Sequence, residues 1–157
     1  MSTAENLPVL REHLPYPRVR DEVCAWVADG MEGGTDVPDA FFRVLRRLGY
    51  GDADRYRHPR FYGQVARALN TLVMDGELVK DVNHTRPVYW TLQGWRDHEA
   101  DLARQAAAEE AVLIRWGAVY DKLAAAGLAS LNDRGRVPEL SLEQWEQLVG
   151  KLAQDET

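Results

Sequence analysis

The residues best suited to chemistry lie on a predicted helix, residues 59–75, and they suit hydrogen bonding rather than catalysis. The helix has an apolar stripe, and its polar residues and one glycine lie away from it: Arg60, Tyr62, Gly63, Gln64, Arg67 and Thr71. Gln64 can bond an adenine edge, and Arg67 a guanine edge or a phosphate. Gly63 would let another backbone come close. This set predicts contacts to nucleic acid, unless it is simply the solvated face of an amphipathic helix.

A second candidate follows this helix directly. Residues 78–82 and 88–92 are short, apolar-rich segments around a polar connection, which predicts a β-hairpin. The candidate residues at its tip are Asn83, His84, Thr85 and Arg86. Such a tip could lie along a minor groove, with Arg86 or His84 facing phosphates. An ordinary polar hairpin loop would have the same composition, so both interpretations stay open.

Charge is unevenly distributed along the chain. The 157 residues carry a formal net charge of -6, which is the wrong sign for a nucleic-acid-binding protein. Residues 40–86, however, hold nine cations and five anions, whereas residues 97–157 hold six cations and twelve anions. The basic stretch adds Arg46 and Arg57 as candidate phosphate contacts. An ordinary surface with uneven charges is the alternative.

The sequence offers little sign of an enzyme. It contains no phosphate-binding loop, no hydrolase nucleophile motif, no zinc-protease motif and no dinucleotide fingerprint. The single cysteine, Cys24, rules out an intrachain disulfide and a cysteine zinc site, and the four histidines lack metal-ligand spacing. We therefore expect no catalysis, cofactor or metal. No long apolar run opens the chain, so a cytoplasmic protein without a membrane partner is expected.

Periodicity and capping signals predict a mainly α-helical fold with a small β-hairpin. Asp36 is expected to cap the second helix, Ser141 and Gln144 to form a capping box at the last one, and Asp75-Gly76 to end the helix that starts at Pro59. Residues 1–16 form an arm or a disordered lead-in. The predicted elements are helices over 17–29, 36–49 and 59–75, the hairpin, a long helix over 96–126 and a final helix over 141–153. A polar linker, residues 50–58, precedes the helix at Pro59. The expected domains are the arm 1–16, residues 17–95, and a helical C-terminal region 96–157.

The order of three helices and a hairpin resembles the winged helix-turn-helix superfamily of DNA-binding domains. The resemblance is carried by the run QVARALNTLVMDGELVK, residues 64–80, with the hairpin after it. It covers roughly residues 17–92 and implies sequence-specific binding of double-stranded DNA in transcriptional regulation. Helix 59–75 would enter the major groove and the hairpin 78–92 would be the wing. The link of residues 49–58 is longer than the short turn usual in such motifs.

The long predicted helix carries a seam with alternating spacings of four and three residues, broken by Glu109. Its apolar members are Leu102, Ala106, Leu113, Trp116, Tyr120 and Leu123. Such a seam predicts pairing with another helix. By analogy with winged-helix regulators the partner is a second chain, which predicts a homodimer. The alternative is that the seam packs against the final helix and the hairpin strands of the same chain. The acidic C-terminal third also leaves open a protein-protein adaptor without DNA binding.

Overall fold

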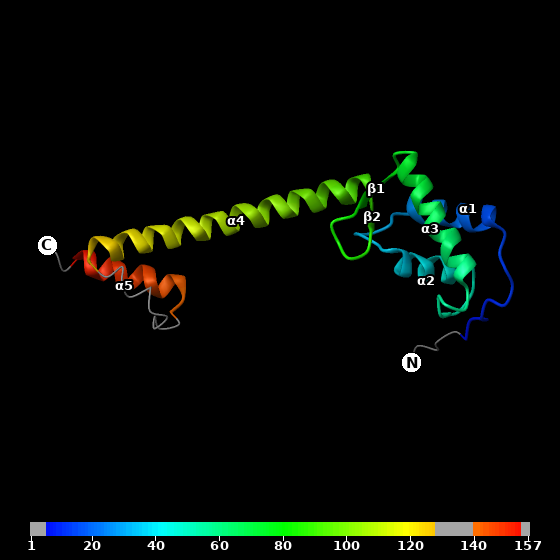
Figure 1. Ribbon diagram of the computed structural model, residues 1–157, viewed down its shortest axis with the longest axis horizontal. Helices are drawn as coiled ribbons and strands as arrows, with labels where there is room; N and C mark the ends of the chain where they lie inside the picture. Colours follow the sequence, from blue (N-terminus) through cyan, green and yellow to red (C-terminus); the bar gives the residue numbers. More distant parts are fainter. Residues whose placement is uncertain (1–5, 128–139, 155–157) are drawn as a thin grey trace. The chain divides into compact units, whose positions relative to one another are not determined.

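The computed structural model describes residues 6–127 and 140–154, without the Ala153 side chain (Figure 1). The elements in these ranges are α1 (Tyr16–Ala28), α2 (Val37–Arg47), α3 (Pro59–Met74), β1 (Leu78–Asp81), β2 (Val88–Thr91), α4 (Leu92–Ala125) and α5 (Leu142–Gln154). The prediction of a mainly helical chain with one antiparallel hairpin is confirmed for this part of the chain. The chain divides into two compact units, Met1–Glu99 and Ala100–Thr157. None of the described helices combines the length and apolar character needed to span a membrane.

Two of the predicted helix caps are present. The Asp36 carboxylate accepts a 2.9 Å hydrogen bond from the backbone N–H of Asp39 at the start of α2. At α5, the Ser141 N–H donates to Gln144 Oε1 and the Gln144 N–H donates to Ser141 Oγ, which is the predicted capping box. These local signals located both helix starts because each cap involves residues only three positions apart.

The start of α4 differs from its prediction. The helix begins at Leu92 rather than at residue 96, and it follows β2 without a loop. Thr91, the last residue of β2, accepts a 3.0 Å hydrogen bond from the Gly94 N–H at its side-chain oxygen. This bond occupies one of the unpaired donors of the first helical turn. The hairpin therefore ends at Thr91, one residue before the predicted end of the wing.

The core of the first unit is built around Phe41 on α2, whose side chain is fully buried. Its ring centroid lies 5.1 Å from those of Phe42 and Phe61 and 5.9 Å from that of Tyr62. The remaining buried side chains of α1, α2 and α3 surround this group: Val19, Val23, Trp26, Ala40, Val44, Leu45, Val65, Ala68, Leu69 and Leu72. The apolar stripes of the three helices thus meet in one core, as their periodicity predicts.

Of the two predictions for the N-terminal segment, an arm or a disordered lead-in, the disordered lead-in is wrong for residues 6–15. Leu10 and Leu14 are buried in the core of the first unit. The Gly51 N–H donates a 2.8 Å hydrogen bond to the Pro8 carbonyl, so this segment also pairs with the linker before α3. The linker in turn buries Ala53. The segment has no helical or alternating period, so its two anchoring leucines gave no signal in the sequence.

The hairpin is attached to the helices by backbone and side-chain bonds. On the side of β2 away from β1, Thr35 and Tyr89 exchange two backbone hydrogen bonds, of 2.9 and 2.7 Å. On α3, Asn70 Oδ1 accepts hydrogen bonds from Lys80 Nζ at 3.0 Å and from the buried Tyr89 hydroxyl at 2.9 Å. These contacts fix the hairpin against α3. The hairpin needs this support because two strands alone are only marginally stable.

Gly34 lies so close to side chains of β2 that it has no room for a side chain of its own. A Cβ atom at this position would lie 2.5 Å from Trp90 Cζ2 and 2.6 Å from Val88 Cγ1. Trp90 is also held by other rings, because it stacks on His98 with ring centroids 4.4 Å apart and meets Trp95 at 6.2 Å. Trp90, Trp95 and His98 therefore form a packed cluster between β2 and the first turns of α4.

The second unit packs the later part of α4 against α5. Its buried side chains are Val119, Leu123, Leu142, Trp145 and Val149, with Trp116 and Leu140 partly buried beside them. Arg115 on α4 also forms an ion pair with Glu146 on α5. Leu148, although it is an apolar residue of α5, is 44% exposed.

The predicted seam of α4 coincides only in part with the face that α5 covers. Trp116 and Leu123 contact the α5 cluster, and Val119, which the predicted seam omits, is buried between them. The other four seam residues are exposed: Leu102, Ala106, Leu113 and Tyr120. The covered stripe is rotated relative to the predicted one, because α5 packs over residues 116, 119 and 123 rather than over residues 113 and 120.

Candidate nucleic-acid interface

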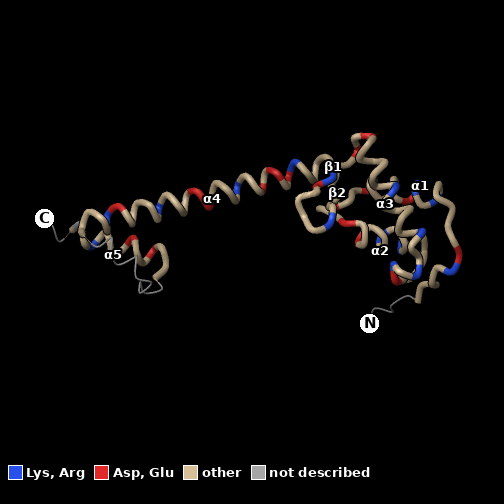
Figure 2. The backbone as a smooth tube through the Cα atoms, viewed as in Figure 1, with Lys and Arg blue, Asp and Glu red and all other residues tan. Residues whose placement is uncertain are grey.

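The orientation of α3 decides which of its polar residues are available. Phe61, Val65, Ala68, Leu69 and Leu72 face the core. On the opposite side, Arg60, Gly63 and Arg67 are exposed, at spacings that place them along one face of the helix. The sixteen residues of α3 include no acid, whereas acidic residues mark the turn just after it (Figure 2). The exposed basic residues of α3 therefore lie in its first turn, at Arg60, and near its middle, at Arg67.

The two arginines of this face are free of carboxylates. Neither Arg60 nor Arg67 forms an ion pair with any described residue. Gly63 lies between them, and a Cβ built there would meet nothing within 4 Å. This combination leaves two cations and an unobstructed stretch of backbone on one helix face, which is the arrangement that a polyanion could approach.

Gln64 and Arg67 contact the segment before α1. Gln64 Nε2 donates a 2.9 Å hydrogen bond to the Leu14 carbonyl, so one amide donor is already occupied. The Arg67 guanidinium carbon lies 4.3 Å from the centroid of the Tyr16 ring. Both side chains are thus oriented by residues 14–16. The sequence showed no sign of this contact, because about fifty residues separate the partners.

Tyr62 and Thr71 are less available than the sequence suggested. Tyr62 was expected to lie away from the apolar stripe, but its ring packs against the core beside Phe41. Thr71 Oγ1 donates a 2.9 Å hydrogen bond to the Arg67 carbonyl one turn earlier in the helix. Tyr62 therefore belongs mainly to the core, and the Thr71 hydroxyl is occupied within α3.

The arginines around α2 divide into paired and unpaired groups. Arg46, a predicted DNA contact, makes two hydrogen bonds to the Asp52 carboxylate, at 2.8 and 2.7 Å. The hydrogen bonds from Arg46 lower the pKa of Asp52 below its usual value. Arg47 is held by Glu22 and Asp29. Arg43 and Arg57 are exposed and form no ion pair with the described residues.

The four predicted contact residues of the hairpin tip, Asn83, His84, Thr85 and Arg86, are all exposed. The tip is organised around the buried Asp81 carboxylate, which accepts a 2.9 Å hydrogen bond from the Asn83 N–H and lies 3.0 Å from His84 Nε2. The Asn83 N–H and then the charge of His84 lower the pKa of Asp81, although its burial opposes them. The His84 ring is thus held by Asp81 of its own hairpin.

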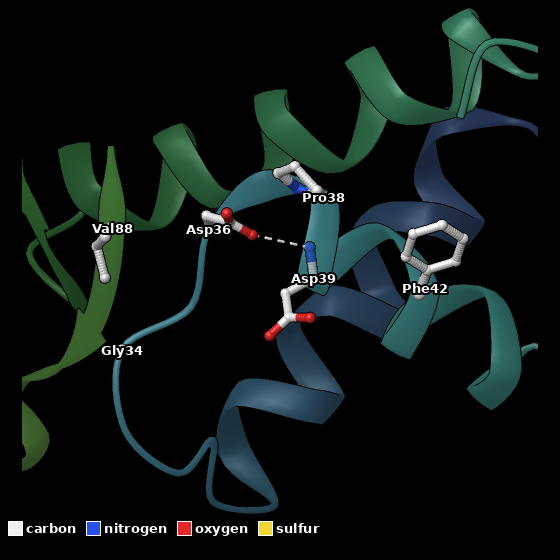
Figure 3. A pocket seen from close by; sticks show the side chains of 6 residues that line it. All are labelled: Gly34, Asp36, Pro38, Asp39, Phe42 and Val88. Carbon is white, nitrogen blue, oxygen red and sulfur yellow. Dashed lines mark hydrogen bonds between the residues drawn. The ribbon is translucent and has the colours of Figure 1, made fainter. Parts of the chain in front are cut away.

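An acidic hollow borders the hairpin on its α2 side (Figure 3). It has a volume of about 440 Å³, and its lining residues are Gly34, Asp36, Pro38, Asp39, Phe42 and Val88. The Asp36 carboxylate caps α2 and also lies 3.9 Å from Arg86 Nη1. Asp36 therefore offsets part of the positive charge of Arg86, which weakens the electrostatic case for the hairpin tip relative to that for α3.

Comparison of the chain with protein-family models, with curated proteins and with solved structures finds no match. The functional interpretation therefore depends on the geometry of the described residues.

Proposed function

We propose that the chain binds double-stranded DNA through the exposed face of α3, as a sequence-specific regulator of transcription with a winged-helix domain. The observation that carries the proposal is the unpaired face of α3, formed by Arg60, Gly63 and Arg67. A major groove about 12 Å wide admits one α-helix, and arginine is the side chain best suited to guanine edges and phosphates. The Gly63 backbone would lie closest to the DNA.

The arrangement of the hairpin supports the same proposal. The hairpin follows α3 directly, and Asn70 and Thr35 fix it to the helical part of the unit. In the proposed complex, Asn83, Thr85 and Arg86 contact the phosphate backbone beside the groove that α3 occupies. Arg57, at the end of the linker before α3, adds a further cation near the helix N-terminus. Phosphate contacts of this kind fix the position of a protein on DNA, whereas base contacts supply specificity.

The test compares two arginine substitutions that remove the same charge. Labelled duplexes of random sequence are titrated with wild-type protein, Arg67→Ala and Arg46→Ala at several salt concentrations, with fluorescence anisotropy as the readout. Arg67→Ala should weaken binding by about 1–3 kcal/mol and lower the slope of log K against log salt by about one. Arg46→Ala should bind like the wild type, because Asp52 already occupies that guanidinium.

The proposal fails if the wild type shows no salt-dependent binding to any duplex pool. It also fails if Arg46→Ala and Arg67→Ala lose affinity equally, since the loss would then follow net charge rather than the α3 face. Sequencing of the duplexes retained at high salt then distinguishes sequence-specific from general binding.

We further propose that the protein forms a homodimer through the uncovered seam of α4. The seam residues Leu102, Ala106, Leu113 and Tyr120 remain exposed although α5 packs beside them. Burial of large apolar side chains is the main favourable term in protein association. A second copy of the chain offers the same seam, and a two-fold dimer pairs identical surfaces.

Neighbouring residues on α4 provide a matched pair for testing self-association. Leu113 and Ile114 are 69% and 66% exposed, but only Leu113 lies on the seam. Leu113→Glu should shift the protein from dimer to monomer, because a charge would be buried at the interface. Ile114→Glu should leave the dimer intact. Sedimentation equilibrium measures both, and a wild type that stays monomeric at all concentrations contradicts the proposed dimer.

A protein-protein adaptor without DNA binding is the second candidate. The observation in its favour is that acids pair with Arg46, Arg47 and Arg86, which reduces the positive field around α3. The same anisotropy experiment separates the two functions. An adaptor gives no salt-dependent DNA binding, and it is recovered with a stoichiometric protein partner in an affinity purification.

A further inference from the structure

We infer that Tyr16 is a positioning residue for Arg67, so that the start of α1 determines how α3 presents its central arginine. The inference rests on the proposed function, because it concerns the same face of α3. It assigns a role to a residue outside the helix that would enter the groove. The observation that carries it is the cation–π contact between the two side chains, in which the Arg67 guanidinium carbon lies 4.3 Å from the centroid of the Tyr16 ring.

The contact with Tyr16 leaves Arg67 able to bind. The guanidinium has five N–H donors, and none of them donates a hydrogen bond to a described residue. Arg67 forms no ion pair with a described residue, and its side chain is exposed. Its donors therefore remain available for the two acceptors of a guanine edge or for a phosphate, while its orientation is restricted.

Tyr16 is itself firmly held. It is the first residue of α1, between Pro15 and Pro17, whose rings restrict the backbone at this point. Its ring is partly buried against the core of the first unit. The preceding Leu14 is buried, and its carbonyl accepts the hydrogen bond from Gln64 Nε2. Residues 14–16 thus contact both of the predicted base-reading side chains of α3, Gln64 and Arg67.

The expected benefit is preorganisation. A free arginine side chain loses rotamer freedom when it is fixed in an interface, and a side chain that is already oriented loses less. The smaller loss of rotamer freedom corresponds to a roughly 3- to 10-fold gain in affinity. The Tyr16 hydroxyl makes no hydrogen bond within the described residues, so only its ring is needed. Phenylalanine should therefore substitute for tyrosine at this position.

The test is a double-mutant cycle in the anisotropy assay, with Tyr16→Leu, Arg67→Ala, the double variant and Tyr16→Phe. We expect Tyr16→Leu to weaken binding roughly 3- to 10-fold in the wild-type background. It should have no further effect in the Arg67→Ala background, and Tyr16→Phe should bind like the wild type. Thermal denaturation of each variant identifies the temperature range in which all are folded.

A second measurement does not involve DNA. In the NMR spectrum, the Arg67 Nε–H resonance should be displaced by the ring current of Tyr16, should keep that displacement in Tyr16→Phe and should lose it in Tyr16→Leu. The inference is overturned if the displacement is absent, or if Tyr16→Leu weakens binding equally in both backgrounds, as a merely structural role requires. Absence of DNA binding by the wild type would instead overturn the proposed function, and the inference with it.

Discussion

Phe41→Ala should destabilise the first unit by about 3–5 kcal/mol, the usual cost of removing a fully buried aromatic side chain. Phe41 is 0% exposed and contacts the rings of Phe42, Phe61 and Tyr62. Truncation leaves a cavity between α2 and α3, and the neighbouring rings are too constrained by their own packing to fill it. The loss approaches the total stability of many domains, so a substantial unfolded fraction of this unit is expected.

Hydrogen exchange read by mass spectrometry can follow α1, α2 and α3 separately from the second unit. Exchange of their amides should accelerate in Phe41→Ala. Met74→Ala is the matched control, because Met74 lies on α3 but is 86% exposed, and its truncation should change exchange little. Equal effects of the two substitutions would show that Phe41 does not hold the core together.

Gly34→Ala should destabilise the first unit by roughly 1–3 kcal/mol, at the upper end of that range, because the new methyl group has no room. It would lie within 2.6 Å of ring atoms of Trp90 and of Val88 Cγ1. The Trp90 ring cannot easily move, since it is stacked on His98 and packed against Trp95. The clash therefore pushes β2 away from Thr35, whose backbone pairs with Tyr89, and loosens the hairpin.

Urea denaturation followed by circular dichroism measures this cost, and Gly63→Ala provides the control. Gly63 lies within α3 and a Cβ there meets nothing, so alanine should stabilise the helix by about 0.5–1 kcal/mol. The same variant should weaken DNA binding if the backbone at Gly63 approaches the groove. A neutral Gly34→Ala would contradict the close approach of Gly34 to Trp90.

The local signals of the sequence predicted most of the secondary structure. The Asp36 cap, the Ser141–Gln144 capping box and the apolar stripe of α3 each depend on residues within a few positions of one another. Gly76, with a φ of +75°, ends α3 where the Asp75-Gly76 pair predicted. The start of α4 was predicted less well, because its cap is the last residue of a strand, Thr91.

The sequence indicated which residues could form the candidate site, but it did not show which of their side chains are free to bind a ligand. Arg60, Gly63 and Arg67 lie on the exposed face of α3 as expected. Tyr62 packs beside Phe41, and Arg46 is occupied by Asp52. Helical periodicity gives the angle of a side chain around its own helix, but it does not show which other elements cover that angle.

The sequence by itself determined the helices, the hairpin and a basic α3 followed by an acidic C-terminal region, because propensity, capping and charge are properties of neighbouring residues. The tertiary structure decided which arginines are free, that Leu10 and Leu14 belong to the core, and that α5 covers Val119 instead of Leu113. It also brought Tyr16 beneath Arg67. These contacts join residues far apart in the chain, and side-chain packing selects them.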